Sequence, residues 1–296
     1  MIRTERDSGV VRKHSVAECI SVLCFAAMTV ALATGNAQAQ TVTEFSAGIT
    51  AGATPNSITA GPDGNMWFTE LTGNRIGRIT TAGVVTEFSA GITAGAGLEG
   101  ITTGPDGNIW FTERTIDRIG RITPLGVVTE FSVGITAGAY PISIVTGPDG
   151  NLWFTEFAIN RIGRITPAGV VTEFSVGLSP GALPSHITAG PDGNLWFTEF
   201  GTNGIGRITT SGVVTEFTAG ISPGANLFDI TAGPDGNLWF SEIADRIGRI
   251  TTVPGGGGGP PPVATVIPTM QTWTLFALGL LILAVTAGVA RRSRGG

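Results

Sequence analysis

The stretch Gly104-Pro105-Asp106-Gly107-Asn108-Ile109-Trp110-Phe111-Thr112-Glu113 joins a tight turn to a short strand. Asp-Gly supplies the positive φ that a hairpin turn needs, and the apolar and aromatic residues that follow are typical of a strand. Its first five residues occur five times, beginning at residues 61, 104, 147, 190 and 233, a constant step of 43 residues. A fixed step of this size indicates a repeat architecture in which each copy is one structural unit.

Each repeat is predicted to hold four short antiparallel strands. In the second copy these are residues 100–103, 109–113, 118–123 and 127–131, and Gly120 in the third strand is expected to mark a bulge or a close contact. Four strands in about 40–45 residues are typical of a propeller blade. The predicted fold class is therefore all-β, a β-propeller of five four-stranded blades spanning residues 40–252.

The order of strands also predicts how the propeller closes. Val42-Thr43-Glu44-Phe45 has the sequence of a fourth strand, whereas the last copy ends after its third strand at Arg246 to Thr251. The N-terminal strand is expected to complete the last blade and leave no unpaired edge. The alternative is an open arc of blades that dimerises.

Composition excludes several classes of protein. The 296 residues include 45 glycines without a three-residue period, so the chain is not collagen-like. With 42% hydrophobic and 13% charged residues, general disorder is not expected. The segment 40–252 holds ten arginines and nineteen acidic residues, a net charge of −9. We expect no nucleic-acid partner, because phosphate binding needs a basic face.

Residues 1–39 are predicted to be a signal peptide. An apolar run from Ile20 to Thr34 is followed by Ala37-Gln38-Ala39, the small-x-small pattern that signal peptidase cleaves. The alternative is an uncleaved N-terminal anchor. The run follows four basic residues: Arg3, Arg6, Arg12 and Lys13. Both cysteines, Cys19 and Cys24, lie in this segment, so we expect no disulfide or thiolate site in the body.

The C-terminal end is predicted to be a linker and a membrane segment. Residues 253–266 are rich in Gly and Pro, as linkers are, and residues 267–296 combine Ile267-Pro268-Thr269, Trp273, an uncharged apolar stretch and terminal arginines. The stretch is just long enough to span a bilayer, and its arginines should stay cytoplasmic. The pattern resembles the IPTL-type sorting signals of Gram-negative bacteria, which implies a membrane sorting protease as partner. The alternative is a plain single-span anchor.

Together the two ends predict an exported protein. We expect an intermediate anchored in the inner membrane by the C-terminal helix, and then a periplasmic, cell-surface or extracellular location.

The candidate binding site is predicted from the loops that precede the first strand of each repeat. The turns at the opposite end are nearly identical, whereas these loops differ, and a single ligand site needs different groups around one axis. The predicted ligand contacts are Asn56, Glu99, Ser185 and Asp229. The ligand class stays open between a small molecule, a glycan and a protein.

The repeat as a whole resembles the streptogramin B lyase (virginiamycin B lyase) family. The matching segments are Gly-Pro-Asp-Gly-Asn-Leu-Trp-Phe-Thr-Glu, Asn-Arg-Ile-Gly-Arg-Ile-Thr and Val-Thr-Glu-Phe. The resemblance implies a propeller, seven-bladed in that family, and a metal-dependent elimination that opens a cyclic depsipeptide antibiotic.

The family's functional residues are not matched here. The positions that correspond to its histidine are Asn56, Glu99, Ile142, Ser185 and Phe228, and none of the upstream positions is glutamate. His186 is displaced by one place, which in a regular strand turns the side chain to the other face. His186 is nonetheless the one candidate catalytic base, and Glu242 the one candidate metal ligand.

Three other repeated residue types are expected to be structural. Asp belongs to the turn and Trp packs between blades. The Glu that ends the second strand is expected to form hydrogen bonds between blades or to pair with an Arg of the third strand. The alternative for these glutamates is a ring around a cation. The glutamates are Glu70, Glu113, Glu156, Glu199 and Glu242, and the arginines are Arg78, Arg121, Arg164, Arg207 and Arg249.

The sequence thus favours an exported ligand-binding or interaction module that has lost catalysis. No cofactor is assigned to such a module. The alternative is a metal-dependent C–O lyase that uses Mg²⁺ to open streptogramin B antibiotics. A third possibility is a structural matrix protein, because the repeats are so uniform.

Overall fold

The computed structural model describes residues 41–252, and the predicted signal peptide, linker and C-terminal membrane segment lie outside them. Two compact units divide the chain, Met1–Phe45 and Ser46–Gly296, and all strands belong to the second. In the part of the chain that is described, no helix is long and apolar enough to cross a membrane.

The described residues form nineteen strands in five antiparallel sheets, which we call blades one to five. Each sheet follows the order of its strands in the sequence, as the four-strand repeat predicts. Blade one holds β1 (Pro55–Ala60), β2 (Met66–Glu70), β3 (Arg75–Ile79) and β4 (Val85–Phe88). Blade two holds β5 (Leu98–Thr103), β6 (Ile109–Glu113), β7 (Arg118–Ile122) and β8 (Val128–Phe131), with a 3₁₀ turn, η1 (Arg114–Ile116), after β6.

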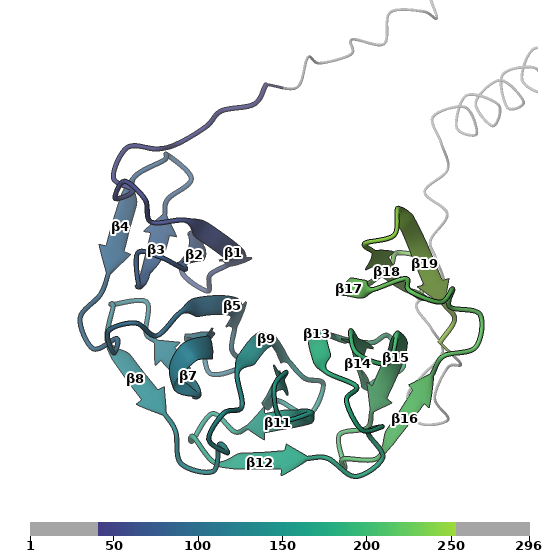
Figure 1. The fold of residues 1–296 in the computed structure, drawn as a ribbon. Coiled ribbons are helices and arrows are strands. Elements are labelled where there is room, and N and C mark those ends of the chain that lie inside the picture. Colours follow the sequence, from purple (N-terminus) through teal and green to yellow (C-terminus); the bar gives the residue numbers. More distant parts are fainter. Residues whose placement is uncertain (1–40, 253–296) are drawn as a thin grey trace, which may run out of the picture. The chain divides into compact units, whose positions relative to one another are not determined.

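Blades three and four are built in the same way, and blade five has one strand fewer. Blade three holds β9 (Pro141–Thr146), β10 (Leu152–Glu156), β11 (Arg161–Ile165) and β12 (Val171–Phe174). Blade four holds β13 (Pro184–Ala189), β14 (Leu195–Glu199), β15 (Gly204–Ile208) and β16 (Val214–Phe217). Blade five holds β17 (Leu227–Ala232), β18 (Leu238–Glu242) and β19 (Arg246–Ile250). The first strands of consecutive blades lie against one another along the inside of an arc (Figure 1).

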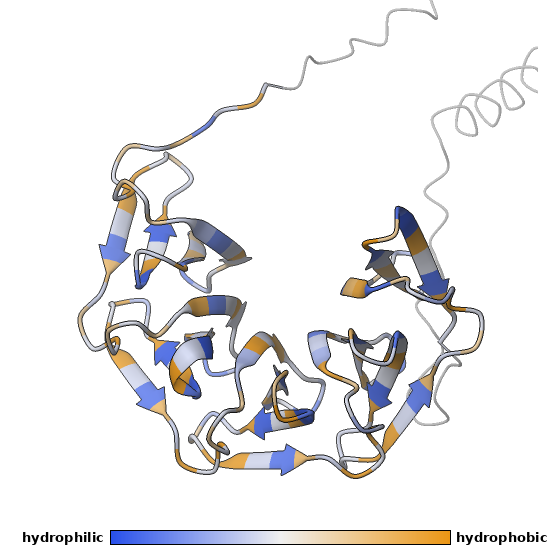
Figure 2. Cartoon of the chain, in the orientation of Figure 1, coloured by the Kyte–Doolittle hydropathy of each residue, from blue (hydrophilic) through white to orange (hydrophobic). Residues whose placement is uncertain are grey.

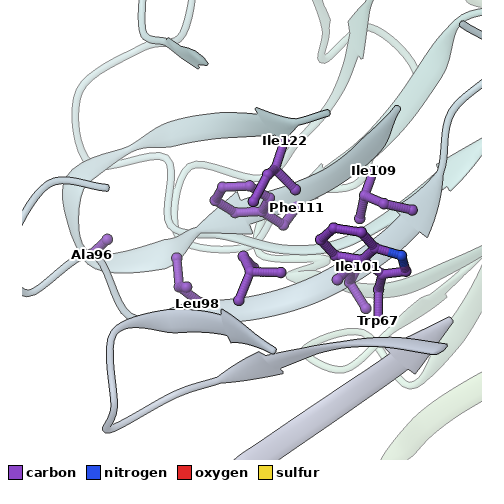
Figure 3. Packing of buried hydrophobic residues seen from close by; sticks show 8 residues of the cluster. Trp67, Ala96, Leu98, Ile101, Ile109, Phe111 and Ile122 are labelled. Atoms are coloured by element: carbon purple, nitrogen blue, oxygen red, sulfur yellow. The ribbon is translucent and has the colours of Figure 1, made fainter. Parts of the chain in front are cut away.

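The core lies between the blades. Trp67 and Ile76 of blade one pack against Leu98, Ile101 and Ile109 of blade two, and all five are buried (Figure 3). The same set recurs at the following interfaces. The predicted packing role is confirmed for four of the five tryptophans, whereas Trp239 of blade five is 37% exposed. Burying a large apolar side chain contributes roughly 1.5–3 kcal/mol, so each interface fixes how one blade sits on the next.

The outer strand closes each blade over its tryptophan. Strands such as β12 begin and end on hydrophobic residues, with hydrophilic residues between them (Figure 2). The terminal Phe174 stacks on Trp153 with ring centroids 5.3 Å apart, and the Arg164 guanidinium lies over both rings. Each of the four outer strands therefore contributes an aromatic ring to the interface.

The turn aspartates hold the indole rings. Asp106 Oδ1 accepts a hydrogen bond from Trp110 Nε1 at 3.0 Å, and the Asn108 side chain donates to the other carboxylate oxygen. The same pattern is present in all five blades. Their predicted role in the turn is confirmed, and the anchoring of the tryptophan is an additional role.

The third-strand glycine makes a close contact and does not form a bulge. Gly120 pairs with Phe111 in a regular register. A Cβ at Gly120 would lie 2.1 Å from the Phe111 ring, so the glycine makes room for that ring. The register is broken in the first strand instead, at the site described below.

The predicted closure by the N-terminal strand is not observed. Residues 42–45 form no strand, Val42 is 90% exposed, and the sheet of blade five has three strands. The outward faces of the end blades are also uncovered. Ile58 is 61% exposed and Ile247 is 68% exposed, whereas the equivalent Ile101 and Ile205 of inner interfaces are 7% and 1% exposed. The angle between blades is set by the packed side chains, and a matching number of strands does not determine it.

Candidate functional site

A β-bulge interrupts the first strand of every blade. In blade two Leu98 pairs with Glu113 and Ile101 with Phe111, so that Glu99 and Gly100 lie opposite the single residue Thr112. The register shifts at the same place in the other four blades. The predicted contacts Asn56, Glu99, Ser185 and Asp229 all lie in these bulges. A bulge redirects side chains, so strict alternation of faces does not hold here.

A buried threonine holds each bulge to the next blade. Thr112 Oγ1 accepts a hydrogen bond from Gly100 N at 2.9 Å and donates one to the carbonyl of Ile142 at 2.9 Å. Thr69, Thr155 and Thr198 make the same two bonds in their blades. The inner strands therefore form a rigid surface on which the loops at this end are mounted.

His186 is part of a small polar and aromatic cluster. Ser185 Oγ and His186 Nδ1 are 3.0 Å apart, and the His186 ring lies 4.6 Å from the Phe228 ring. A hydroxyl beside an imidazole is the pairing that activates a nucleophile. Within residues 41–252, however, no carboxylate bonds to the imidazole to orient it. The prediction that strict alternation turns His186 away does not apply, because the bulge lies at this residue.

Glu99 is held by an arginine. Arg114 Nη1 lies 3.0 Å from Glu99 Oε2, and the Arg114 guanidinium lies over the Tyr140 ring, 4.8 Å from its centroid. These three residues come from blades two and three and connect the two loops at this end. The Glu99 carboxylate is therefore paired with the Arg114 guanidinium and is not free to bind a metal.

Tyr140 begins an aromatic row that the sequence analysis missed. The Tyr140 and Phe157 rings lie 6.4 Å apart, and so do the Phe157 and Phe200 rings. Arg114, Phe157 and Phe200 occupy the same position, directly after the second strand, in blades two, three and four. We call Arg114, Tyr140, Phe157 and Phe200 the aromatic row.

A sequence signal for the row existed. The residue after Thr-Glu varies among repeats, as Leu71, Arg114, Phe157, Phe200 and Ile243. In the structure Phe157 N donates to the Tyr140 carbonyl, so the loops after the second strand lie beside the loops before the first. The loops before the first strand therefore form only half of the variable end, and the loops after the second strand form the other half.

The remaining predicted residues do not converge. Asn56 and Asp229 are exposed, and Asp229 Oδ1 accepts a hydrogen bond from the N–H of Ile230. Glu242 Oε2 binds Arg246 Nε at 2.9 Å. Among residues 41–252 no three His, Cys, Asp or Glu side chains are grouped to hold a metal ion. Glu99 and Glu242 are each paired with an arginine, so these two carboxylates do not fit the Mg²⁺ that the family resemblance implies, since that ion is held by free carboxylates and other oxygen ligands.

The repeated glutamates have a structural environment different from the predicted one. Glu113 is fully buried near the Glu130 carboxylate, and neither of its carboxyl oxygens has a hydrogen-bond partner among the described residues. Burial and the nearby negative charge of Glu130 raise the pKa of Glu113 to about 8. Burial also raises the pKa of Glu70 to about 7, of Glu156 to about 9 and of Glu199 to about 7. Burial and a neighbouring carboxylate therefore favour the protonated, neutral form of these groups.

The predicted pairing of these glutamates with Arg78, Arg121, Arg164, Arg207 and Arg249 is wrong, although Glu242 pairs with another third-strand arginine, Arg246. Arg121 Nη1 donates to the carbonyl of Pro167 and lies 3.7 Å from Asp106 Oδ2, because its side chain points to the other end of the strand. Arg118 instead contacts Glu130. Burial alone would raise the pKa of Glu130, but hydrogen bonds from Thr93 and Arg118 outweigh that effect and lower it.

Five meandering sheets with buried tryptophans between them, and variable loops at one end of the inner strands, define a β-propeller-type fold. A family model for the virginiamycin B lyase family matches residues 25–255. The chain belongs to that family.

Solved structures support this assignment. A virginiamycin B lyase from Staphylococcus aureus is 46% identical over 69% of each chain, with a TM-score of 0.66. A catalytically inactive histidine-to-alanine variant of that enzyme with quinupristin matches at 46% identity over 69% of each chain, with a TM-score of 0.65. A streptogramin B lyase is 36% identical over 73% of this chain and 74% of its own, with a TM-score of 0.64.

More distant structures share the fold alone. A gluconolactonase from Xanthomonas campestris is 16% identical over 68% of this chain and 73% of its own, with a TM-score of 0.53. No curated protein matches the chain significantly.

Proposed function

We propose that this chain is a ligand-binding member of the virginiamycin B lyase family that does not catalyse the lyase reaction. The observation that carries the proposal is the aromatic row at the variable end of the blades. The neighbouring bulges bring no three His, Cys, Asp or Glu side chains of residues 41–252 together. Aromatic faces and a nearby arginine suit a ligand with apolar or planar rings and a polar acceptor group.

Quinupristin is the first ligand to test. It is the molecule present in the solved structure of the inactive relative. Three features of the site support binding of such a ring-bearing macrocycle. The row presents rings at 6.4 Å intervals, Arg114 offers a donor at one end, and the threonine bonds keep the inner strands rigid. A preformed surface costs less ordering on binding than a mobile one.

The absence of catalysis is argued from the site. An elimination requires a positioned base and a group that stabilises the developing negative charge. His186 is hydrogen-bonded to Ser185 and its ring lies against that of Phe228, and no carboxylate of the described residues forms a hydrogen bond or an ion pair with the imidazole. Glu242 and Glu99 are each bound to an arginine.

The second candidate function is a C–O lyase that opens streptogramin B antibiotics with Mg²⁺. The 46% identity to the solved lyase favours it, and so does the Ser185–His186 pair. It would require metal ligands from outside the residues described.

Export is part of the proposal and rests on the sequence of the two ends. A signal peptide at 1–39 and a C-terminal anchor with a sorting signal at 267–296 would place the blades outside the inner membrane. Signal peptidase and a membrane sorting protease would then be processing partners. The ligand would meet the blades in the periplasm or at the cell surface.

The test uses the full-length chain, purified in mild detergent, with quinupristin as probe. We expect quinupristin to raise the melting temperature and to be recovered intact by mass spectrometry with or without Mg²⁺. Phe157→Ala should weaken binding by about tenfold, as loss of a central aromatic contact does, whereas the exposed-site control Val176→Ala should not. Mg²⁺-dependent ring opening that is lost in His186→Ala would contradict the proposal and establish the lyase.

A further inference from the structure

The outward faces of the first and last blades carry the residue positions that meet at the inner interfaces. Blade one exposes Ile58 and Met66, and blade five exposes Trp239 and Ile247. At each of the four inner interfaces the equivalents of these residues are buried against one another. The chain thus displays, at its two ends, the surfaces that it packs together four times internally.

The apolar parts match by repeat position. We call the face of a blade that packs on the following blade its outgoing face, and the face that packs on the preceding blade its incoming face. Trp67 and Ile76, at the outgoing face of blade one, pack on Ile101 and Ile109 of blade two. The outgoing face of blade five carries Trp239 and Ile247 at these positions, and the incoming face of blade one carries Ile58 and Met66. An exposed apolar cluster of this kind marks an interaction surface.

The polar parts match as well. At each inner interface a threonine hydroxyl donates to the carbonyl of the first bulge residue of the next blade, as Thr198 does to Phe228 at 2.9 Å. In blade five the equivalent is Ser241, which accepts the Asp229 N–H but donates to no carbonyl within residues 41–252. Its counterpart is the carbonyl of Asn56, in the bulge of blade one.

A third match concerns the arginine at the other end. Arg78 donates to the carbonyl of Pro124 in the next blade at 3.0 Å, and Arg121 and Arg164 do the same to Pro167 and Thr210. Arg249 is the equivalent residue of blade five. The carbonyl equivalent to that of Pro124 in blade one is that of Thr81.

The missing fourth strand of blade five has a candidate as well. The inner tryptophans each stack on the phenylalanine that ends the fourth strand, with centroids 5.3–5.5 Å apart. Trp239 has no such partner among the described residues. Phe45 ends the one Val-Thr-Glu-Phe segment that belongs to no sheet, Val42-Thr43-Glu44-Phe45.

We propose that the outgoing face of blade five binds the incoming face of blade one of a second copy of this chain. Residues 42–45 of that second copy then form the fourth strand in blade five of the first copy. A second copy is the occupant because both faces are uncovered at once in a single chain. The interface is heterologous, head to tail, so each copy keeps one face of each kind for further copies. Association therefore extends beyond a dimer unless the ring closes.

Sedimentation velocity of the full-length chain in density-matched mild detergent tests the proposal. We expect the mass of the wild type to rise with concentration. Ile247→Glu disables the outgoing face and Ile58→Glu disables the incoming face. Copies of either variant alone should therefore not associate with one another. An equimolar mixture of the two should form a dimer, because each supplies the intact face that the other lacks.

Two controls separate the proposal from its rivals. Leu125→Glu places the same charge at an exposed residue away from both faces and should behave as wild type. Circular dichroism and the melting temperature check folding, and Phe45→Ala offers a milder second variant that should weaken association of the otherwise intact chain. A wild type that stays monomeric, or a mixture that forms no dimer, would overturn the proposal and indicate a chain that closes on itself or stands alone.

Discussion

Phe88 stacks on Trp67 with ring centroids 5.5 Å apart and an interplanar angle of 15°, and Arg78 lies over both rings. Phe45 occupies the same place in its own repeat segment but has no tryptophan partner within the described residues. Comparing Phe88 with Phe45 therefore tests what the fourth strand contributes to a blade.

Phe88→Ala should lower the free energy of unfolding by about 2–3 kcal/mol, somewhat less than for a fully buried phenylalanine, because Phe88 is half-buried. Phe45→Ala should change it by less than about 0.5 kcal/mol at protein concentrations too low for association, since exposed residues contribute little. Urea unfolding followed by tryptophan fluorescence measures both. Equal losses in the two variants would show that Phe45 already packs within the single chain.

Stability should fall as the pH rises from mildly acidic to alkaline. The pKa of Glu113 is raised from 4.5 in the unfolded chain to about 8 in the folded one, so the folded state binds more protons in this window. The contribution is fully present below the unfolded pKa and is lost as the pH rises through the folded pKa. Melting temperatures between about pH 5 and pH 9 measure the slope.

Glu113→Gln should reduce this slope and raise the melting temperature at alkaline pH, because the buried amide stays uncharged at every pH beside the Glu130 carboxylate. Glu99→Gln is the matched control, since Glu99 is paired with Arg114 and not with another carboxyl group. A slope unchanged by Glu113→Gln would show that other groups bind the protons.

Gly120→Ala should destabilise the protein by about 1–3 kcal/mol, because the added methyl group would lie 2.1 Å from the Phe111 ring. The double variant Gly120→Ala with Phe111→Leu makes room for the methyl group and should lose less than the sum of the two single losses. Chemical unfolding of all four proteins gives the coupling. Simple additivity would mean that the loss arises from the backbone and not from the contact.

Thr112→Val should cost about 2–4 kcal/mol, because it leaves the Gly100 N–H and the Ile142 carbonyl without partners in a buried place. Ser241→Ala removes the equivalent hydroxyl of blade five, which satisfies one N–H and no carbonyl of a next blade within the described residues. We expect a loss below about 1.5 kcal/mol there. Comparable losses in the two variants would remove the inter-blade bond as the explanation.

Much of the fold could be predicted because the strands and turns are local features. Asp106 and Trp110 lie within one hairpin, and so does the equivalent pair in each other repeat. The sequence of a single repeat therefore indicates both the strand and the turn that anchors its tryptophan. The candidate site was predicted only in part. Glu99 and Ser185 were found as variable residues, whereas Phe157 and Phe200 were missed because their loops meet those of Tyr140 only in the folded blades.

The partner of Glu113 could not be predicted from spacing. Arg121 is nearer to it in the sequence than Glu130 is, but the third strand directs Arg121 to the other end of the blade. A side chain's neighbour across two strands depends on register and on which end of the strand it faces. These quantities are settled when the sheet forms.

By itself the sequence determined the repeat, the strand order within a blade and the residues that pack between blades, because these follow from patterns of two to forty-three residues. Only the tertiary structure decided that residues 42–45 join no sheet and that both end faces are uncovered. The angle from one blade to the next arises from the packing of Trp67, Ile101 and their equivalents. Four such angles add up to an arc, and the number of strands does not determine their sum.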